Sequence, residues 1–595
     1  MRTTCKPTGL RVALSSGDKK SIPRIPDSMP IKRLQLAAYS SVDLTVLARI
    51  TGLFFLALSF VWITASAAAA DEIINQELQT EKFQLGKVTV NNRNIFDDNA
   101  ASSLRFVNSL HRVTREHVIR REIWLKTGDE FDRQDLAEIE RNLRRLDLFA
   151  RVRVRTQASA DQPEHTDLIV NTYDRLSLVA NAGGSFLGGI GQVTFSVGDK
   201  NLFGLGHELL FGYSENTKGE LLGSVSYDNV LLWSTDVFGS FQAGQTEEGN
   251  FGALRIRNRF QHHLDNLAWN IQLERETTRQ DFFEQGVSVI EVPKTEESIR
   301  TNRLKRRGHR YGFWRYGPFL TATRTTFDAA IGPQAQTIAI PEDNTTIFAG
   351  AQIANDRTRS FRTITDIDSL GFEQDIVLGR SIEVSLGLEH VEQQTSSQTL
   401  PSFRLRSWAH NGLGKHNFLN FGIGAGARID KDEFDAWSVS TAATWFNTRF
   451  DKQTIAARLI YESAFDSDEL PIQQTLGEDS GLRGYPAREF NDEQSLLLNL
   501  EYRFNSGLNL ASFEIGALVF FDAGFVAERD GTSSFSALLD EPLTSTGLGL
   551  RIGSPQILGS NIIRLDFAVP LENNSNEDFS PTFSFAVGHV FNFRP

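Results

Sequence analysis

The carboxy-terminal 420 residues, from Leu176 to Pro595, alternate between apolar and polar side chains and contain no apolar run long enough for a membrane helix. In Ile382–Glu389, Ile, Val and Leu occupy every second position, and Glu, Ser and Gly fill the positions between them. Ile563–Pro570 and Thr582–Phe593 show the same period of two. This period predicts many β-strands. In water the apolar faces would form the core of a sandwich, and in a membrane they would face lipid.

A segment near the amino terminus has the features of an export signal. Ile50–Ile63 carries no charge, a basic residue precedes it, and Ala65-Ser66-Ala67 supplies the small residues of a cleavage site. A membrane anchor over this region is the alternative, although the strongly apolar part is short for a span. The sequence therefore predicts a presequence with a signal peptide at 1–70 and a short linker at 71–82.

An export signal allows the alternating region to lie in a membrane outside the cytoplasm. Every backbone polar group in lipid needs a partner, so a sheet that crosses a membrane must close on itself. At roughly 26 residues per strand and connection, 420 residues allow about 16 strands. We therefore predict a mainly β protein, in which 176–595 forms a transmembrane antiparallel β-barrel of about 16 strands in a bacterial outer membrane.

Composition argues against several other classes of protein. The formal charge is 61 − 74 = −13, whereas a nucleic-acid-binding surface should be basic. The only cysteine, Cys5, lies in the predicted presequence, so we expect no disulfide and no thiolate metal site. Common enzyme motifs are missing from the sequence, and Gly422–Ala427 is interpreted as a strand with small residues. We expect no enzyme activity, no cofactor and no metal, and we interpret His262-His263 as a solvated pair.

Residues 83–175, between the linker and the barrel, have a mixed pattern. Leu85–Val90 is predicted to be a strand and Thr114–Trp124 a helix. Asp132 is a good N-cap for a second helix, and two strands follow it, the first of which includes Arg151–Arg155. The order β-α-α-β-β is enough for one compact α+β domain.

A long polar stretch in the barrel region is predicted to be an external loop. It covers Glu284–Arg303 and runs into the dense basic cluster Arg303–Arg310. Aromatic residues follow at once, among them Trp314 and Tyr316, which suggests an interfacial aromatic girdle beneath a basic loop. The cluster is interpreted either as a contact for anionic lipid headgroups or lipopolysaccharide, or as an ordinary solvated loop.

Two parts of the chain resemble known domains. Leu125–Asp132, Leu143–Phe149 and Val152–Val154 resemble the motifs of a POTRA domain. In the barrel region, Asp199–Gly206 and Gly481–Tyr485, taken with that domain, resemble the BamA/TamA superfamily of outer-membrane assembly proteins. The resemblance covers about 83–595. It implies a periplasmic POTRA-like domain at 83–175 and a barrel at 176–595.

The resemblance also implies roles for particular residues. An Arg-Gly-aromatic triplet marks a long loop that folds back into the barrel, and here it is part of Leu482, Arg483, Gly484 and Tyr485. The alternation independently places Glu501 and Asp522 on the lumen side of their strands. A confined arginine needs a carboxylate, and the resemblance implies that Arg483 pairs with Asp522, with Glu501 nearby. The alternative is that these residues are ordinary luminal charges of a barrel. The early hairpin motif comprises Asn201, Gly204 and Gly206.

One strand of the POTRA-like domain carries Arg151, Arg153 and Arg155 on one face. An extended client segment could add to this strand through main-chain hydrogen bonds. The alternative is that the arginines keep an edge strand from aggregating.

These features together predict an outer-membrane assembly, insertion or translocation factor that works without a nucleotide. Client strands would bind at the POTRA edge and at a weak seam between the first strand, near Leu176–Gly184, and the last, near Thr582–Phe593. Gly183-Gly184 would weaken the first strand. Expected partners are membrane lipid and lipopolysaccharide, unfolded client barrels or secreted proteins, and an accessory periplasmic or inner-membrane protein. A secretion pore for one exported protein, and a passive porin or surface antigen, are the alternatives.

Overall fold

The computed structural model describes residues 81–588, with internal gaps. The gaps are 96–107, 109–110, 147, 188, 218–220, 233–235, 247–248, 365–366, 368–369, 371–373, 432, 467–469, 511–512, 528–538, 540–541, 554–561 and 572–580. The predicted presequence at 1–70 lies outside the described residues, as do nearly all of the linker at 71–82 and the end of the predicted last strand at 589–593.

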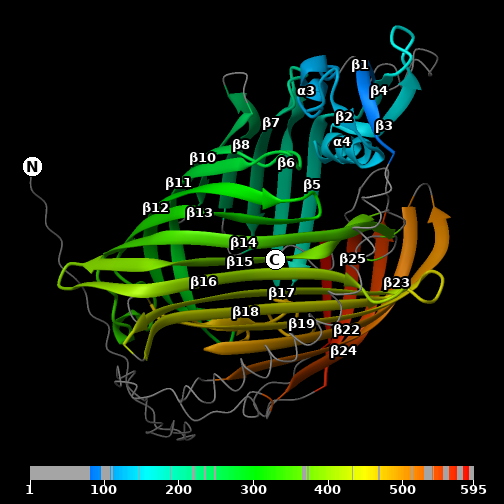
Figure 1. Ribbon diagram of the computed structural model, residues 1–595. Helices are drawn as coiled ribbons and strands as arrows, with labels where there is room; N and C mark the ends of the chain where they lie inside the picture. The colour runs from blue at the N-terminus through cyan, green and yellow to red at the C-terminus, as the bar shows by residue number, and fades with distance from the viewer. Residues whose placement is uncertain are drawn as a thin grey trace, which may run out of the picture. The chain divides into compact units, whose positions relative to one another are not determined.

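The first described part is a small α+β domain (Figure 1). Its elements are β1 (Phe83–Arg93), α3 (Glu116–Arg120), β2 (Glu130–Phe131), α4 (Arg133–Arg145), β3 (Phe149–Ala158) and β4 (Thr166–Asp174). The strands form one sheet in the order β2-β1-β4-β3, with β1 parallel to β4 and β3 antiparallel to it. Strand β3 therefore lies at an edge of this sheet.

Helix α4 is fixed at its start by a capping box. The side chain of Asp132 accepts hydrogen bonds from the N–H groups of Gln134 and Asp135, and the Asp135 side chain accepts one from the Asp132 N–H. The helix predicted over Thr114–Trp124 is shorter in the structure, where α3 has five residues. Trp124 lies beyond the helix but still packs against the hydrophobic core of the domain.

The remaining strands form a closed antiparallel barrel of twenty strands within the described residues. They are β5 (Leu178–Leu187), β6 (Ile190–Leu202), β7 (His207–Asn216), β8 (Leu221–Leu232), β9 (Val237–Thr246), β10 (Asn250–Asn258), β11 (Leu267–Glu284), β12 (Val287–Gly308), β13 (Gly312–Phe327), β14 (Asn344–Ile364), β15 (Gln374–Gln393), β16 (Ser397–Gly412), β17 (Asn417–Asp430), β18 (Glu433–Asn447), β19 (Gln453–Asp466), β22 (Gln494–Leu510), β23 (Phe513–Ala527), β24 (Leu543–Gly553), β25 (Ile562–Pro570) and β26 (Thr582–Gly588). A 3-10 turn, η1 (Ala335–Thr337), lies between β13 and β14.

The predicted number of about 16 strands was wrong. The estimate used one average length per strand, but β5 to β10 have only 9 to 13 residues each and short connections. Short strands with tight turns fit more strands into the same length of chain.

The predicted external loop Glu284–Arg303 was also wrong, because most of it is strand β12. Only Gln285 and Gly286 connect β11 to β12, and both have positive φ (49° and 72°), as a tight hairpin turn requires. The polar residues are paired across the two strands, as in Arg279 with Glu291 (3.1 Å). The polar composition of this stretch reflects a long, wet hairpin.

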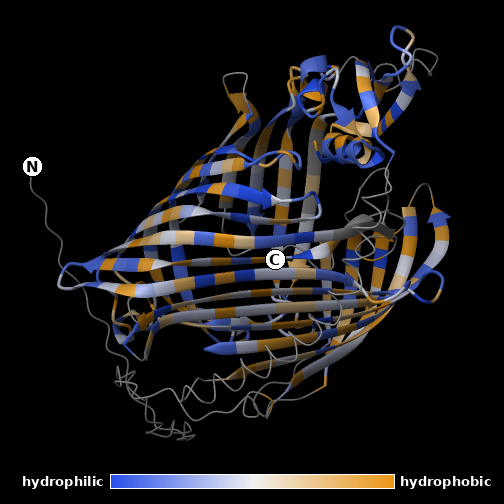
Figure 2. Ribbon diagram, viewed as in Figure 1, coloured by the Kyte–Doolittle hydropathy of each residue, from blue (hydrophilic) through white to orange (hydrophobic). Residues whose placement is uncertain are grey.

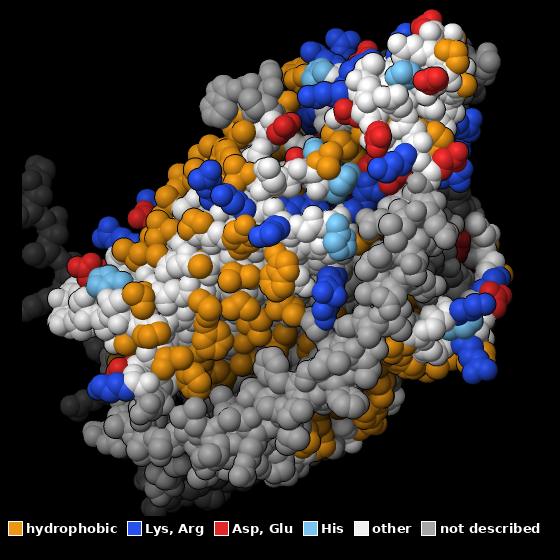
Figure 3. All heavy atoms as spheres, in the orientation of Figure 1, with side chains coloured by type: hydrophobic (Ala, Val, Ile, Leu, Met, Phe, Trp, Pro, Cys, Tyr) orange, Lys and Arg blue, Asp and Glu red, His pale blue; other side chains and the backbone are white. Residues whose placement is uncertain are grey.

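The barrel wall is apolar outside and polar inside. Figure 2 shows the two residue types alternating along the strands, and Figure 3 shows hydrophobic side chains gathered on the face in view. On β25, Phe567 is 48% exposed, whereas its neighbour Asp566 is 5% exposed. Among the residues that the structure describes, no helix combines the length and apolar character needed to cross a bilayer.

The pairing between β5 and β26, which we call the seam, is short. Up to Gly588, where the described part of the chain ends, it consists of two residue pairs, Phe186 with Phe585 and Ser185 with Ala586. By contrast, β5 pairs with β6 over its whole length, from Leu178 to Leu187. Val587 and Gly588 pair with β25 but not with the two glycines of β5. Within the described residues, the barrel is therefore closed by few main-chain contacts.

Candidate functional site

The connection between β19 and β22 folds into the barrel. It contains a small hairpin of β20 (Gln474–Leu476) and β21 (Phe490–Asp492). Leu482 and Tyr485 are 0% and 1% exposed, and they pack with Leu476, Leu497 and Leu543. We call residues 470–493 the luminal loop, because its centre contacts the inward faces of β22 and β23.

The structure brings Arg483 to both predicted carboxylates. Its Nε and Nη2 donate to the two oxygens of Asp522 at 2.7 and 2.8 Å, and its Nη1 donates to Glu501 Oε1 at 2.8 Å. The guanidinium carbon also lies 3.6 Å from the centroid of the Phe520 ring. A planar bidentate pair of this kind fixes the direction as well as the position of an arginine.

Further polar side chains complete this network. Asn499 Nδ2 donates to Asp522 Oδ1 (2.8 Å) and to the carbonyl oxygen of Gly481 (2.9 Å). Arg503 Nε donates to the second oxygen of Glu501 at 2.7 Å. Asn499 and Arg503 share the parity of Glu501 along β22, so they also face the lumen, but no role was predicted for them. Two arginines thus face two carboxylates.

The other loop residues position Arg483. Gly484 has φ of +93°, and an added Cβ would lie 3.3 Å from Ala568 Cβ and 3.4 Å from Ser545 Cβ. Glycine therefore relieves strain there and allows close approach to the wall. The Tyr485 hydroxyl donates to the carbonyl oxygen of Thr544 at 2.8 Å, and its ring meets Phe490 edge-on.

The luminal loop is also held at its entrance by the β11–β12 hairpin. The Gln473 side chain accepts from the Phe283 N–H (2.9 Å) and donates to the Phe283 carbonyl oxygen (3.1 Å). Leu470 is 1% exposed and packs with Phe282, Ile290 and Val292. Local sequence patterns do not indicate this contact, because its two sides are 190 residues apart.

The early hairpin motif lies far from the loop network, at the contact with the amino-terminal domain. Asn201 is 1% exposed, and its Nδ2 donates to Thr114 Oγ1 at 2.8 Å. Its Oδ1 accepts from the Gly206 N–H at 2.8 Å, which closes the turn between β6 and β7. A single side chain, that of Asn201, therefore joins the barrel turn to the amino-terminal domain.

The glycines of this motif allow the two surfaces to approach. Gly204 has φ of +74°, its carbonyl oxygen accepts from the Arg115 N–H at 2.8 Å, and an added Cβ would lie 2.5 Å from the Val113 carbonyl oxygen. An added Cβ at Gly206 would lie 3.2 Å from Val118 Cγ1 and 3.3 Å from Leu148 Cδ1. A side chain at either position would push the domain away from the turn.

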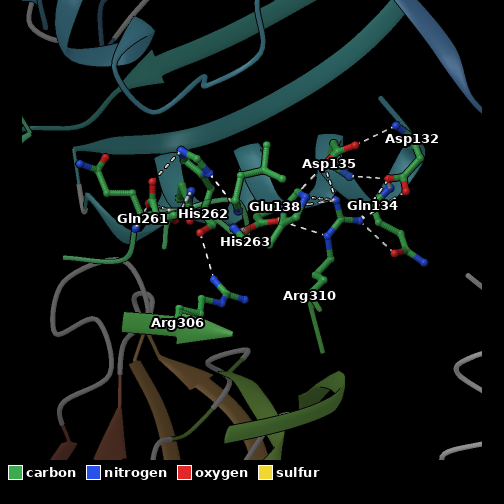
Figure 4. A network of polar contacts seen from close by, with 12 residues as sticks. Asp132, Gln134, Asp135, Glu138, Gln261, His262, His263, Arg306 and Arg310 are labelled. Carbon is green, nitrogen blue, oxygen red and sulfur yellow. Dashed lines mark hydrogen bonds and ion pairs between the residues drawn. The ribbon is translucent and has the colours of Figure 1, made fainter. Parts of the chain in front are cut away.

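A second contact joins α4 to two other barrel turns (Figure 4). Arg310, between β12 and β13, contacts Asp132 (3.2 Å), Asp135 and Glu138 (3.4 Å). His263, between β10 and β11, contacts Glu138 at 3.0 Å. We call this group of residues the α4 latch.

The interpretation of His262-His263 as a solvated pair was wrong. The side chains are 20% and 19% exposed, and the His262 ring stacks on Trp124 at 4.9 Å. Their partners lie more than 100 residues earlier in the chain, where local sequence gives no sign of them. Ligand atoms of Asp135, Glu138 and His263 lie within 4.8 Å of one another, a spacing that a metal could use, but Arg310 supplies the cation that contacts both carboxylates.

Burial and charge act in opposite directions on the latch carboxylates. Burial alone would raise the pKa of Glu138, but the hydrogen bond and charge of His263, together with Arg310, outweigh it and lower the pKa. The pKa of Asp132 is lowered in the same way, against burial, by backbone hydrogen bonds and by Arg310. Burial prevails for Asp135 and raises its pKa.

The structure places the three arginines of β3 on the exposed edge of the domain sheet, away from the barrel network. Arg151, Arg153 and Arg155 are all exposed, and Arg151 lies 5.8 Å from the centre of the Tyr173 ring. Main-chain groups on the outer side of β3 have no neighbouring strand within the described sheet.

Comparison with known families identifies both parts of the chain. Residues 319–591 match the family described as the Omp85 superfamily domain. This match begins within β13 and runs to the end of the barrel. Residues 102–172 match the POTRA family, described as a surface antigen variable number repeat. The Omp85 barrel therefore lies in the outer membrane, and its POTRA domain lies in the periplasm.

Solved structures show more distant likeness to the chain. BamA from Haemophilus ducreyi lacking POTRA domains 1-3 is 11% identical, covers 84% of each chain and has a TM-score of 0.40. CdiB from Acinetobacter baumannii is 13% identical, covers 85% of this chain and 74% of its own, and has a TM-score of 0.42. At these values the likeness carries no argument. Curated proteins include no significant match.

The POTRA domain fixes the orientation of the Omp85 barrel. The turns that contact it, at 203–206, 259–266 and 309–311, lie on the periplasmic side. The hairpin tip at Gln285 and Gly286 consequently lies on the cell surface. The basic cluster Arg303–Arg310 was predicted to be an external loop, but it occupies the periplasmic end of β12 and the turn that follows. The prediction failed because alternation continues through the cluster.

Proposed function

We propose that this Omp85 protein inserts or translocates client polypeptides at the outer membrane, and that clients pair with the opened seam. The observation that carries the proposal is the short closure between β5 and β26, with two residue pairs in the described structure. Opening so few contacts exposes strand edges whose N–H and C=O groups a client strand can satisfy within lipid.

The remaining features support this function. The exposed edge of β3 offers main-chain groups on the periplasmic side, where an extended client arrives. The arginines of that edge prevent unspecific sheet growth. The Arg483 network anchors the luminal loop to β22 and β23, which only β24 and β25 separate from the seam strand β26, so the wall beside a moving seam keeps its shape.

A disulfide across the seam tests the proposal. Removal of the predicted presequence leaves no cysteine, so Ser185→Cys with Ala586→Cys introduces a single pair at neighbouring backbone positions. The locked protein should lose function under oxidising conditions and regain it with a reductant. The measurement is a census of folded outer-membrane proteins and of secreted proteins in cells that depend on the variant.

The matched control is Phe567→Cys with Phe583→Cys, which joins β25 to β26 and changes neither pair of the seam. This variant should remain active in both redox states. Loss of many barrels on locking would identify a general assembly factor, whereas loss of one secreted protein would identify a dedicated secretion pore. Full activity of the locked seam would refute the proposal.

A further inference from the structure

The periplasmic end of β12 presents three cations to the outside of the barrel. Arg303, Lys305 and Arg307 alternate along the strand and are all exposed. The residues between them turn inward: Leu304 is 5% exposed, and the Arg306 guanidinium lies 3.8 Å from the centre of the Phe313 ring. Ile299, on the same face as the three cations, is 38% exposed to the lipid side. We call Arg303, Lys305 and Arg307 the basic row.

The basic row has no counter-charge among the residues that the structure describes. Within the described part of the chain, none of its side chains makes an ion pair or a hydrogen bond. The carboxylates near this end of the wall point elsewhere, since Asp356 pairs with the inward-facing Arg315 at 2.6 Å. On β14, the exposed Arg357 adds a further positive charge near the same boundary. Cations this close to lipid require an anion from outside the protein.

Aromatic side chains flank the basic row. Trp314 and Tyr316 on β13 are the register partners of Arg307 and Lys305, and they are 53% and 41% exposed. A hollow of about 480 Å³ lies beside them, bordered by Arg307, Gly317 and Ile353. In Figure 3, Lys and Arg side chains lie along the upper border of the hydrophobic field. Amphipathic rings of this kind mark the boundary between acyl chains and headgroups.

The position of the row identifies the leaflet. Arg310, three residues beyond Arg307, contacts the periplasmic POTRA domain. The row therefore lies at the periplasmic leaflet, which excludes the lipopolysaccharide of the cell-surface leaflet as its resident ligand.

We propose that the basic row binds the phosphate of an anionic phospholipid in the periplasmic leaflet. The guanidinium and ammonium groups of Arg303, Lys305 and Arg307 supply the donors, and an acyl chain lies over the hollow beside Tyr316. A lipid held there is fixed next to the turn that carries Arg310. Basic clusters at one face of a membrane protein commonly bind such headgroups.

The test compares lipid affinities of the purified full-length protein by native mass spectrometry. The probes are dioleoyl phosphatidylglycerol, dioleoyl phosphatidylcholine and lipid A. The unmodified protein should bind one molecule of phosphatidylglycerol more tightly than one molecule of phosphatidylcholine. Added salt should reduce this difference in affinity. Lys305→Gln with Arg307→Gln should weaken that binding roughly fivefold per cation, the equivalent of about 1 kcal/mol each.

The control is Arg275→Gln with Arg324→Gln, two exposed cations on the neighbouring strands β11 and β13 that lie beside Glu297, six residues before the basic row. This variant should bind phosphatidylglycerol as the unmodified protein does. Near-UV circular dichroism establishes that each variant is folded. Equal affinity for the two glycerophospholipids, equal loss in both variants, or tighter binding of lipid A at the basic row would each overturn the proposal.

Discussion

Arg483 illustrates how much of the luminal loop depends on one side chain. Its guanidinium makes contacts of 2.7 to 2.8 Å with Asp522 and Glu501, which are 0% and 3% exposed. Buried charges of this kind stabilise a structure only while every partner is present. The residue therefore positions the loop and also neutralises the inner faces of β22 and β23.

Replacing Arg483→Ala should release the luminal loop. Asp522 would lose its ion pair and Glu501 would keep only that with Arg503, and breaking a buried pair costs about 3–5 kcal/mol. Limited proteolysis of the folded barrel should then cleave within 470–493. Arg488→Ala is the matched control, because its pairing with Asp479 is long (3.4 Å) and about 30% exposed. Unchanged protection of the loop in Arg483→Ala would contradict the assignment.

Single strands were predictable, but their number was not. The alternation in Ile382–Glu389 correctly placed a strand there, now part of β15, because the period of two is a local property. Strand lengths range from 7 residues in β26 to 22 in β12, and length depends on how far each hairpin extends beyond the membrane. Composition alone could not separate a wet hairpin from a loop.

In the candidate site too, local features were predictable from the sequence, whereas long-range contacts were not. Parity pointed Glu501 and Asp522 into the lumen, and the resemblance supplied Arg483 as their partner. The contact between Gln473 and Phe283 and the stacking of His262 on Trp124 join residues more than 100 positions apart. No periodic pattern encodes such contacts, because they depend on how complete elements are placed.

The β6–β7 turn should fail as a docking element if Gly204 gains a side chain. Gly204→Ala places a methyl group 2.5 Å from the Val113 carbonyl oxygen, so the POTRA domain must shift. Gly189→Ala is matched to it, since Gly189 also has positive φ (+86°) but no neighbour within 4 Å. Hydrogen exchange of the Arg115 N–H should accelerate at least tenfold in Gly204→Ala only. Equal exchange in both variants would argue against the docking role.

At the scale of the whole molecule, two separate polar contacts between the POTRA domain and barrel turns stand out among the described residues. The Asn201 turn contacts Thr114, and the α4 latch contacts turns at His263 and Arg310. The first joint depends on shape and neutral hydrogen bonds, whereas the second depends on charge. Acid should therefore affect them differently.

Docking through the latch should weaken at low pH. Docking lowers the pKa of Glu138 from its ordinary value of 4.5, so the stabilisation is complete above about pH 4.5 and is lost as the pH falls through the lowered pKa. Asp132 acts in the same direction, whereas protonation of Asp135, whose pKa is raised, favours the docked form. Spin labels at Gln157→Cys and Leu413→Cys should show one narrow distance distribution at pH 7 and a broader one at pH 3.5.

The comparison variant Glu138→Gln should show the broad distribution already at pH 7. A distribution that stays narrow at both pH values would show that the Asn201 turn alone fixes the domain.

The two hydrogen bonds between Gln473 and the backbone of Phe283 connect the cell-surface end of the β11–β12 hairpin to the luminal loop inside the barrel. An antibody or phage that binds the hairpin tip at Gln285 would therefore displace the luminal loop, which also carries Arg483. Agents that bind only at the cell surface would in this way inhibit client insertion or translocation.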